Sequence, residues 1–217
     1  MDVVQTLLSL SLGLGLAAAC GFRVFIPPLM MGVGSRLDLY KLEGSFVWVD
    51  DTWAIAIFAV ATLLEIGGYF IPWIDNLLDA VATPAAIIGG IFVTSASLEG
   101  ELDPSAQWTL SVIAGGSVSG VIQLGTVATR AISTGTTGGL ANPIISLLEA
   151  VASILCILIS LFLVAIIPIV IIFLIWKSIG YIQITKKKSL FKNKRQNIDR
   201  LSFSTMYRLR SKEFFIS

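Results

Sequence analysis

Residues 3–33 read VVQTLLSLSLGLGLAAACGFRVFIPPLMMGV, and this stretch decides the class of the protein. Residues 3–20 carry no charge and are nearly long enough to cross a bilayer, which takes about 20 apolar residues in a helix. Arg23 and the pair Pro27-Pro28 follow at once. Because proline lacks an N–H and clashes inside a helix, the stretch predicts a membrane segment that is broken at the two prolines.

The composition of the rest of the chain agrees with a membrane protein. Of the 217 residues, 55% are hydrophobic and only 13% are charged, where soluble domains have about 25% charged residues. This excludes a soluble domain, and it excludes disorder, which needs few apolar residues. The chain has no histidine, which rules out histidine-ligated metals and histidine bases.

The apolar segments predict an all-α, polytopic membrane helix bundle. The last segment has 33 residues, which is long for one crossing and short for two. The predicted segments, about six in number if the last one crosses twice, are residues 3–33, 53–72, 81–98, 108–127 and 144–176.

Charge is distributed unevenly along the chain and predicts its orientation. Residues 1–176 contain 4 Lys/Arg and 12 Asp/Glu, whereas residues 177–217 contain 11 and 2. Basic flanking segments mark the cytoplasmic side. We therefore predict a membrane domain (1–176) and a basic cytoplasmic tail (177–217) that binds anionic lipid and not nucleic acid. With loops 35–52 and 98–107 on the other side, both termini are cytoplasmic if the last apolar segment crosses twice.

A weak internal repeat runs through these segments. Leu63-Leu-Glu65 precedes Pro84 by the same spacing as Leu147-Leu-Glu149 precedes Pro168, and an arginine followed by proline stands upstream of each copy. The repeat predicts two three-segment halves, 1–98 and 108–176, that run in opposite directions, as in many transporters. Chance matches in apolar sequence remain the alternative. The helix breaks that we predict are at Pro27, Pro28, Pro84, Pro143 and Pro168.

Four charged residues stand inside the apolar segments. A charge near the bilayer centre costs roughly 2.5–3.5 kcal/mol, so each arginine should be paired with a carboxylate. The pairs either line a pathway for an anion or only hold helices together, and the sequence leaves both open. These residues are Arg23, Glu65, Arg130 and Glu149; Asp75 and Asp79, on one face of a helix end, are expected at the membrane interface.

Residues 130–143 are rich in glycine and threonine and predict a non-helical segment. Such backbone is tolerated at membrane depth only inside protein or beside a cavity. Its hydroxyls beside a guanidinium suit a phosphate or a carboxylate, although a plain cytoplasmic loop is the alternative. The polar side chains of this candidate site are Thr134, Thr136, Thr137 and Asn142.

Known enzyme motifs are missing, and we expect no enzyme, no cofactor and no metal. Cys20 and Cys156 lie in apolar stretches and are expected in the core. A lipoprotein cleavage site at Cys20 is a lesser alternative, because no basic residue precedes Arg23.

Several motifs resemble an uncharacterised family of bacterial and cyanobacterial membrane proteins, number four-one-two-six of the domain-of-unknown-function series. They are Leu12-Gly-Leu-Gly-Leu-Ala-Ala-Ala-Cys-Gly-Phe-Arg23 with Pro27-Pro28, Leu63-Leu-Glu65, Asp75-Asn-Leu-Leu-Asp79 with Ala82-Thr-Pro-Ala85, and Gly125-Thr-Val-Ala-Thr-Arg130 with Thr136-Thr-Gly-Gly-Leu-Ala-Asn-Pro143. The resemblance covers roughly residues 1–175 and implies a multi-pass membrane protein without an assigned activity.

Two functions fit the sequence. The first is a small transporter or translocator of an anion or of a phosphate-bearing lipid. The second is a membrane scaffold or assembly subunit, acting as a homo-oligomer or with a protein partner, in which the charges only bridge helices. Either would reside in the cell membrane, or in a thylakoid if the source is a cyanobacterium.

Overall fold

The structure of this chain is a computed structural model that describes residues 3–164 and 166; for Pro72, Trp73, Asp75 and Asn76 it describes the backbone alone. All secondary structure in this part is helical, which confirms the predicted all-α class. Pro168, the tail 177–217 and any second crossing by 144–176 lie outside the described residues. The elements are α1 (Val3–Phe22), α2 (Ile26–Arg36), η1 (Gly44–Asp50), α3 (Thr52–Gly68), α4 (Pro72–Leu98), α5 (Pro104–Leu110), η2 (Ser111–Gly115), α6 (Gly116–Thr137) and a last helix, Asn142–Val164.

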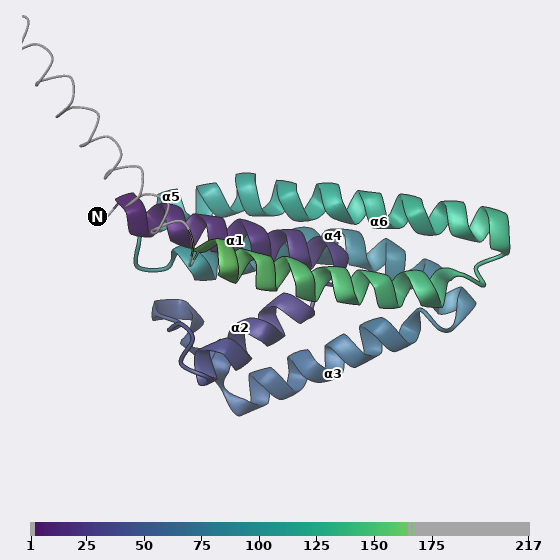
Figure 1. Cartoon of the computed structure of the whole chain (residues 1–217), viewed down its shortest axis with the longest axis horizontal. Coiled ribbons are helices and arrows are strands. Elements are labelled where there is room, and N and C mark those ends of the chain that lie inside the picture. The colour runs from purple at the N-terminus through teal and green to yellow at the C-terminus, as the bar shows by residue number, and fades with distance from the viewer. Residues whose placement is uncertain (1–2, 165, 167–217) are drawn as a thin grey trace, which may run out of the picture. The chain divides into compact units, whose positions relative to one another are not determined.

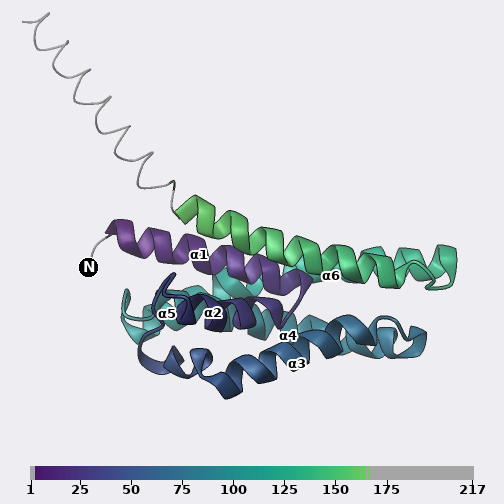
Figure 2. The same cartoon turned by 60° about the horizontal axis from the view of Figure 1, so that its bottom comes forward.

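The long helices lie side by side and give the bundle two ends (Figures 1 and 2). We call the end with residues 37–51 and 99–103 the loop end, and the end with the turns 69–71 and 138–141 the turn end. The helices α1, α3 and α6 run from the loop end toward the turn end, while α4 and the last helix run back (Figure 1). Because α1 and α6 carry the two arginine copies and run the same way, the described residues do not confirm the inverted halves.

The predicted break at the two prolines is present and reverses the chain. The helix α1 ends with the Arg23 N–H donating to the Ala19 carbonyl, 2.9 Å away. Pro27 and Pro28 then lie in the first turn of α2, where the missing N–H has no helical partner to lose. Figure 1 shows α2 returning toward the loop end. The pair α1–α2 therefore enters the bundle and turns back inside it.

This reversal corrects the predicted topology. Gln5 near the start of α1, Lys41 in the first loop and Glu101 in the second line one pocket. The start of the chain is thus on the same side as residues 37–43 and 99–101, and the prediction that placed them on opposite sides is wrong. It assumed that residues 3–33 cross the membrane completely.

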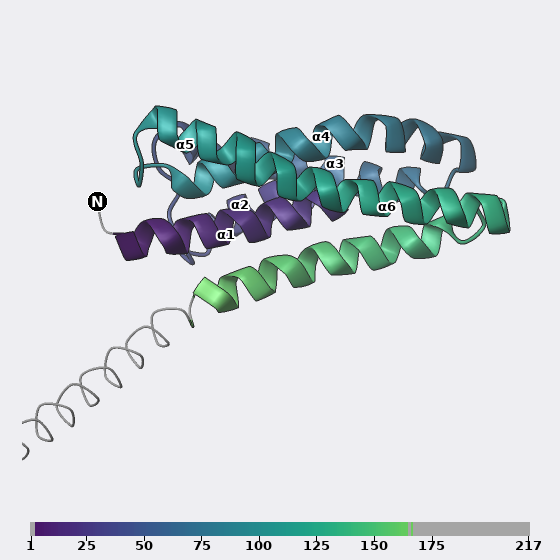
Figure 3. The same cartoon turned by 90° about the horizontal axis from the view of Figure 1, so that it is seen from above.

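The re-entrant pair packs into the centre of the bundle. The helix α1 contacts α4 and α6 along its length, and the last helix runs beside it (Figure 3), with the Ser153 hydroxyl donating to the Ala19 carbonyl at 3.0 Å. A Cβ added to Gly21 would lie 2.7 Å from the Ser119 carbonyl oxygen of α6. Small residues therefore allow these helices to approach closely, as membrane helices do in the absence of a hydrophobic driving force.

The helix boundaries differ from the prediction in two places. Among the described residues, four helices are long and apolar enough to span a membrane, or five if the bent pair η1–α3 counts as one span, so the count of six is not confirmed. The helix α4 is continuous from Pro72 to Leu98 and passes through Pro84. It therefore begins earlier than the predicted segment 81–98, and the predicted break at Pro84 is wrong. Membrane helices tolerate an internal proline where neighbouring groups compensate.

Candidate functional site

Glu65 on α3 holds the break between α1 and α2 in place. Its two carboxylate oxygens accept hydrogen bonds from the backbone N–H groups of Val24 at 2.9 Å and of Phe25 at 3.3 Å. These donors lie at the break, where a buried N–H without a partner would be costly. Within the described part of the chain Glu65 forms no ion pair with an arginine, so the predicted pairing is wrong for this residue.

Arg23 lies at the tip of the re-entrant pair and is completely buried. Its Nη2 donates to the carbonyl and to the hydroxyl of Ser146, both at 2.7 Å, and to Glu149 Oε2 at 3.0 Å. The helix break thereby brings a guanidinium from the first segment against the last helix, 126 residues later in the chain.

Arg130 on α6 is buried beside the same carboxylate. It pairs with Glu149 Oε2, and its Nη1 lies 2.5 Å from Asp79 Oδ1 on α4. Asp79 also accepts a hydrogen bond from the Tyr69 hydroxyl at 3.3 Å. The prediction that both arginines are paired with carboxylates is confirmed, with Glu149 shared between them. Asp79, near the end of a candidate span, is the second partner of Arg130.

Tyr69, in the turn between α3 and α4, joins the two arginines. The guanidinium carbon of Arg130 lies 3.6 Å from the centre of its ring and that of Arg23 lies 4.6 Å away. The face of an aromatic ring attracts cations, more strongly where water is excluded. Tyr69 therefore offsets part of the repulsion between two guanidinium groups. We call Arg23, Glu65, Tyr69, Asp79, Arg130 and Glu149 the charged cluster.

Helix geometry places the cluster at a defined depth. Arg130 is seven residues before the end of α6, Glu149 is seven after the start of the last helix, and Asp79 is seven after the start of α4. At 1.5 Å per residue, each lies about 10 Å inside the turn end. Three helices thus place their charged residues at the same depth in the bundle. Arg23 lies at this depth too, at the end of α1, which starts at the loop end.

The hydrogen bonds of the cluster are incomplete. Nε and Nη1 of Arg23, Nε of Arg130 and Oε1 of Glu149 are buried and have no partner among the described residues. Buried polar groups in folded proteins are nearly always paired. The cluster can therefore accept a further ligand that brings hydrogen-bond acceptors to the arginines.

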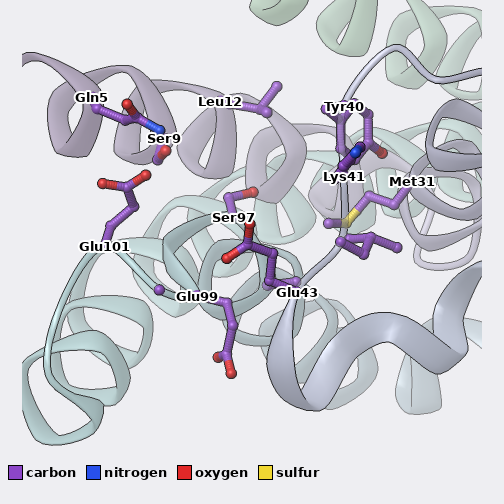
Figure 4. A pocket seen from close by; sticks show the side chains of 13 residues that line it. Gln5, Ser9, Leu12, Met31, Tyr40, Lys41, Glu43, Ser97, Glu99 and Glu101 are labelled. Carbon is purple, nitrogen blue, oxygen red and sulfur yellow. The ribbon is translucent and has the colours of Figure 1, made fainter.

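A pocket of about 620 Å³ opens at the loop end, at the other end of α1 (Figure 4). Gln5 and Ser9 of α1 line it, together with residues of both loops. Figure 4 shows the carboxylates of Glu99 and Glu101 in this region, and Glu99 also accepts a hydrogen bond from the Ser45 N–H at 3.1 Å. Along α1 the buried Leu16 and Cys20 separate this loop-end pocket from the cluster.

The profile of a family described as a domain of unknown function, DUF4126, matches residues 10–183. The chain belongs to this family. The DUF4126 match confirms the resemblance found in the motifs, covers the whole charged cluster, and brings no activity with it. No curated protein and no solved structure matched the chain.

The predicted hydroxyl site is absent from this DUF4126 domain in the form that we expected. The helix α6 continues to Thr137, and only residues 138–141 form a turn, with Gly138 and Gly139 at φ +64° and +86°. Thr136 and Thr137 donate their hydroxyl hydrogens to carbonyls of their own helix. Thr134 accepts a hydrogen bond from the Asn142 side chain at 3.0 Å, and Pro143 follows in the first turn of the last helix. These residues brace the turn.

Metal binding has no support in the same region. Among the described residues, no group of three or more His, Cys, Asp or Glu side chains is arranged to hold a metal ion. The cluster itself mixes cations and carboxylates, and its buried atoms without a partner among the described residues are three arginine nitrogens and one carboxylate oxygen. Its chemistry therefore favours an anionic ligand.

Proposed function

We propose that this protein carries a phosphate-type oxyanion across the membrane, either as free phosphate or as the headgroup of a lipid, and that Arg23 and Arg130 bind it. The observation behind the proposal is the set of buried N–H groups of these arginines that lack an acceptor. A buried donor without a partner costs roughly 1–3 kcal/mol. An oxyanion would supply the missing acceptors.

The chemistry of the two side chains suits this ligand. A guanidinium presents several N–H groups in one plane and binds carboxylates and phosphates through two parallel hydrogen bonds. Arg23 uses only Nη2 for its protein partners, so its other two nitrogens remain for a ligand. Intramembrane arginines are rare and commonly mark a substrate pathway.

The arrangement of the helices supports movement rather than static binding. Broken helices that end inside the bundle are a recurring feature of transporters, whose sites lie at such ends. Here Arg23 lies at the tip of α1–α2, within the cluster. The loop-end pocket opens beside the start of the same pair. The turn end is about 10 Å from the cluster by helix rise. The buried Leu16 and Cys20 would form the barrier that must open on the loop side.

One observation favours a second function, that of a membrane scaffold. Glu149 Oε2 bridges Arg23 and Arg130, and Asp79 extends the bridge to α4. Such a network holds four parts of the chain together whether or not a ligand binds. A scaffold would co-purify with a stoichiometric partner and would move no anion.

The test is transport by the purified full-length chain in liposomes. One set of vesicles measures uptake of radiolabelled inorganic phosphate; a second measures flipping of a fluorescent phosphatidic acid, detected by chemical quenching in the outer leaflet. Asp38→Asn, an acid-to-amide change in an exposed loop, is the control and should behave like the parent. Activity in the first set supports a soluble anion, and activity in the second a lipid headgroup. Rates equal to those of empty liposomes in both sets would refute transport.

A further inference from the structure

We propose that Glu149 takes up a proton together with the anion, so that the protein is a proton–anion symporter. This inference rests on the function proposed above. It comes from the charge count of the cluster and from the unequal environments of the two oxygens of Glu149.

The charge count leaves no room for an extra negative charge. With all groups ionised, the cluster holds two guanidinium groups and three carboxylates, Glu65, Asp79 and Glu149, a net charge of −1. A monovalent oxyanion would change the net charge of the cluster to −2 inside a bundle where charges are poorly solvated. One proton for each anion keeps the net charge constant.

Glu149 is the carboxylate best placed to accept that proton. Its Oε2 pairs with both arginines, whereas its buried Oε1 has no partner among the described residues. A proton on Oε1 turns an unpaired acceptor into a donor, which can bind the oxyanion itself. The same proton weakens the hold of Oε2 on the arginines and frees them for the ligand.

The other two carboxylates accept hydrogen bonds from protein groups that stay in place when a ligand binds. Glu65 accepts two backbone N–H groups at the helix break, and Asp79 is held by Arg130 and by the Tyr69 hydroxyl. Protonating either would break bonds that position the fold. The titratable and charged groups around Glu149 are Arg23 at the α1–α2 break, Glu65 on α3, Tyr69 in the α3–α4 turn, Asp79 on α4 and Arg130 on α6.

The cycle is balanced in atoms and charge. Water on the side with the substrate delivers a proton to Glu149, where an O–H bond forms, and the oxyanion binds Arg23 and Arg130. On the other side the O–H bond breaks and the proton passes to water. The restored carboxylate pairs with both arginines again and displaces the anion. No oxidant or other reactant is required.

The first experiment uses the full-length chain in liposomes with potassium and valinomycin to clamp the membrane potential. The vesicles contain a pH-sensitive dye and have a lumen one pH unit more alkaline than the medium. Total phosphate and lumen pH together give the inside-to-outside ratio of the phosphate monoanion. Symport with one proton predicts a ratio of about ten, because one pH unit corresponds to a tenfold change. A ratio near one in actively transporting vesicles would overturn the inference while leaving transport itself intact.

The second experiment compares the Glu149→Gln variant with Asp38→Asn under the same gradient. Glutamine keeps the shape and one acceptor oxygen but cannot take up a proton, so the variant should equilibrate phosphate without accumulating it. Asp38→Asn should retain the tenfold accumulation. Accumulation by Glu149→Gln equal to the control would refute the role of this residue. If the variant does not fold, the monoanion ratio of the parent decides alone. No phosphate uptake by the parent would refute the symport proposal, and no phosphate uptake together with no lipid flipping would refute both proposals.

Discussion

Replacing Glu65 tests whether this residue caps the helix break or serves as a counter-ion. Its oxygens accept two backbone N–H groups, a buried one from Val24 and a half-buried one from Phe25. Hydrogen bonds to a charged group contribute roughly 1.5–3 kcal/mol each, so Glu65→Ala should lower the free energy of unfolding by about 3–6 kcal/mol. For a chain of this size, 1 kcal/mol corresponds to about 2–4 °C, which predicts a fall of about 6–24 °C in the thermal midpoint.

The amide variant separates the two roles. Glu65→Gln has no charge but keeps one carbonyl oxygen. If Glu65 is a cap, Glu65→Gln should therefore lower the thermal midpoint by about half as much as Glu65→Ala does. If Glu65 were mainly a counter-ion, both variants would lose the charge and fall by similar amounts. The assay is the thermal midpoint of the detergent-solubilised chain by fluorescence-detected size exclusion, with Asp38→Asn as the control. Midpoints within 2 °C of the parent for both Glu65 variants would refute the cap.

Three further predictions concern other contacts. Tyr69→Phe keeps the ring under both guanidinium groups and should cost less than about 1 kcal/mol, whereas Tyr69→Ala should cost more than about 2 kcal/mol; equal thermal midpoints would contradict this. Gly21→Val places side-chain atoms against Ser119 and Ile122 of α6 and should destabilise by about 1–3 kcal/mol, while the same change at Gly125, where nothing lies within 4 Å, should be nearly neutral. The hydroxyl and N–H groups around Asp103, chiefly the Ser105 hydroxyl, lower the pKa of this exposed N-cap residue. Its contribution to stability should be present above the pKa that Asp103 has in the unfolded chain and be lost as the pH falls through the lowered value, so Asp103→Ala should lose less thermal stability in acid than the parent. Identical pH profiles of the thermal midpoint for the two chains would exclude this contribution.

The membrane class and the helix break could be predicted from residues 3–33 because both depend on local composition. An uncharged run sets a span, and two prolines exclude a helix interior. The direction of the chain after the break could not be predicted. It depends on Glu65, which is about 40 residues away and accepts the N–H groups that the break exposes. Local sequence contains no information about such a contact.

The candidate site was predictable where a charge stood in apolar sequence. Arg23, Arg130 and Glu149 stand in or beside apolar sequence, where an unpaired charge is costly, and they were therefore expected to meet a partner. The pairing of Asp79 with Arg130 was not predicted. The helix begins at Pro72, a good first-turn residue that could have shown Asp79 to be two turns inside. Tyr69 carried no signal, because sequence does not show which way a residue in a turn faces.

The glycine and threonine residues near the end of α6 misled the prediction for a different reason. Low helix propensity is a weak indicator that tertiary packing overrides. Here the threonine hydroxyls bond to carbonyls one turn back, and α6 lies against α1 and α4. The helix therefore extends to Thr137 and carries Arg130 within it.

The most direct test of the central claim is phosphate uptake by the Arg23→Lys variant. Lysine keeps the positive charge beside Glu149 and Ser146 but has no counterpart to Nε and Nη1, the donors that we assign to the ligand. Losing one or more charge-assisted hydrogen bonds of roughly 1.5–3 kcal/mol predicts uptake at least about tenfold slower than that of the parent and of Asp38→Asn, with a thermal midpoint close to theirs. Uptake equal to that of the parent, in a variant that folds as well, would contradict the assignment of Arg23 as a binding residue.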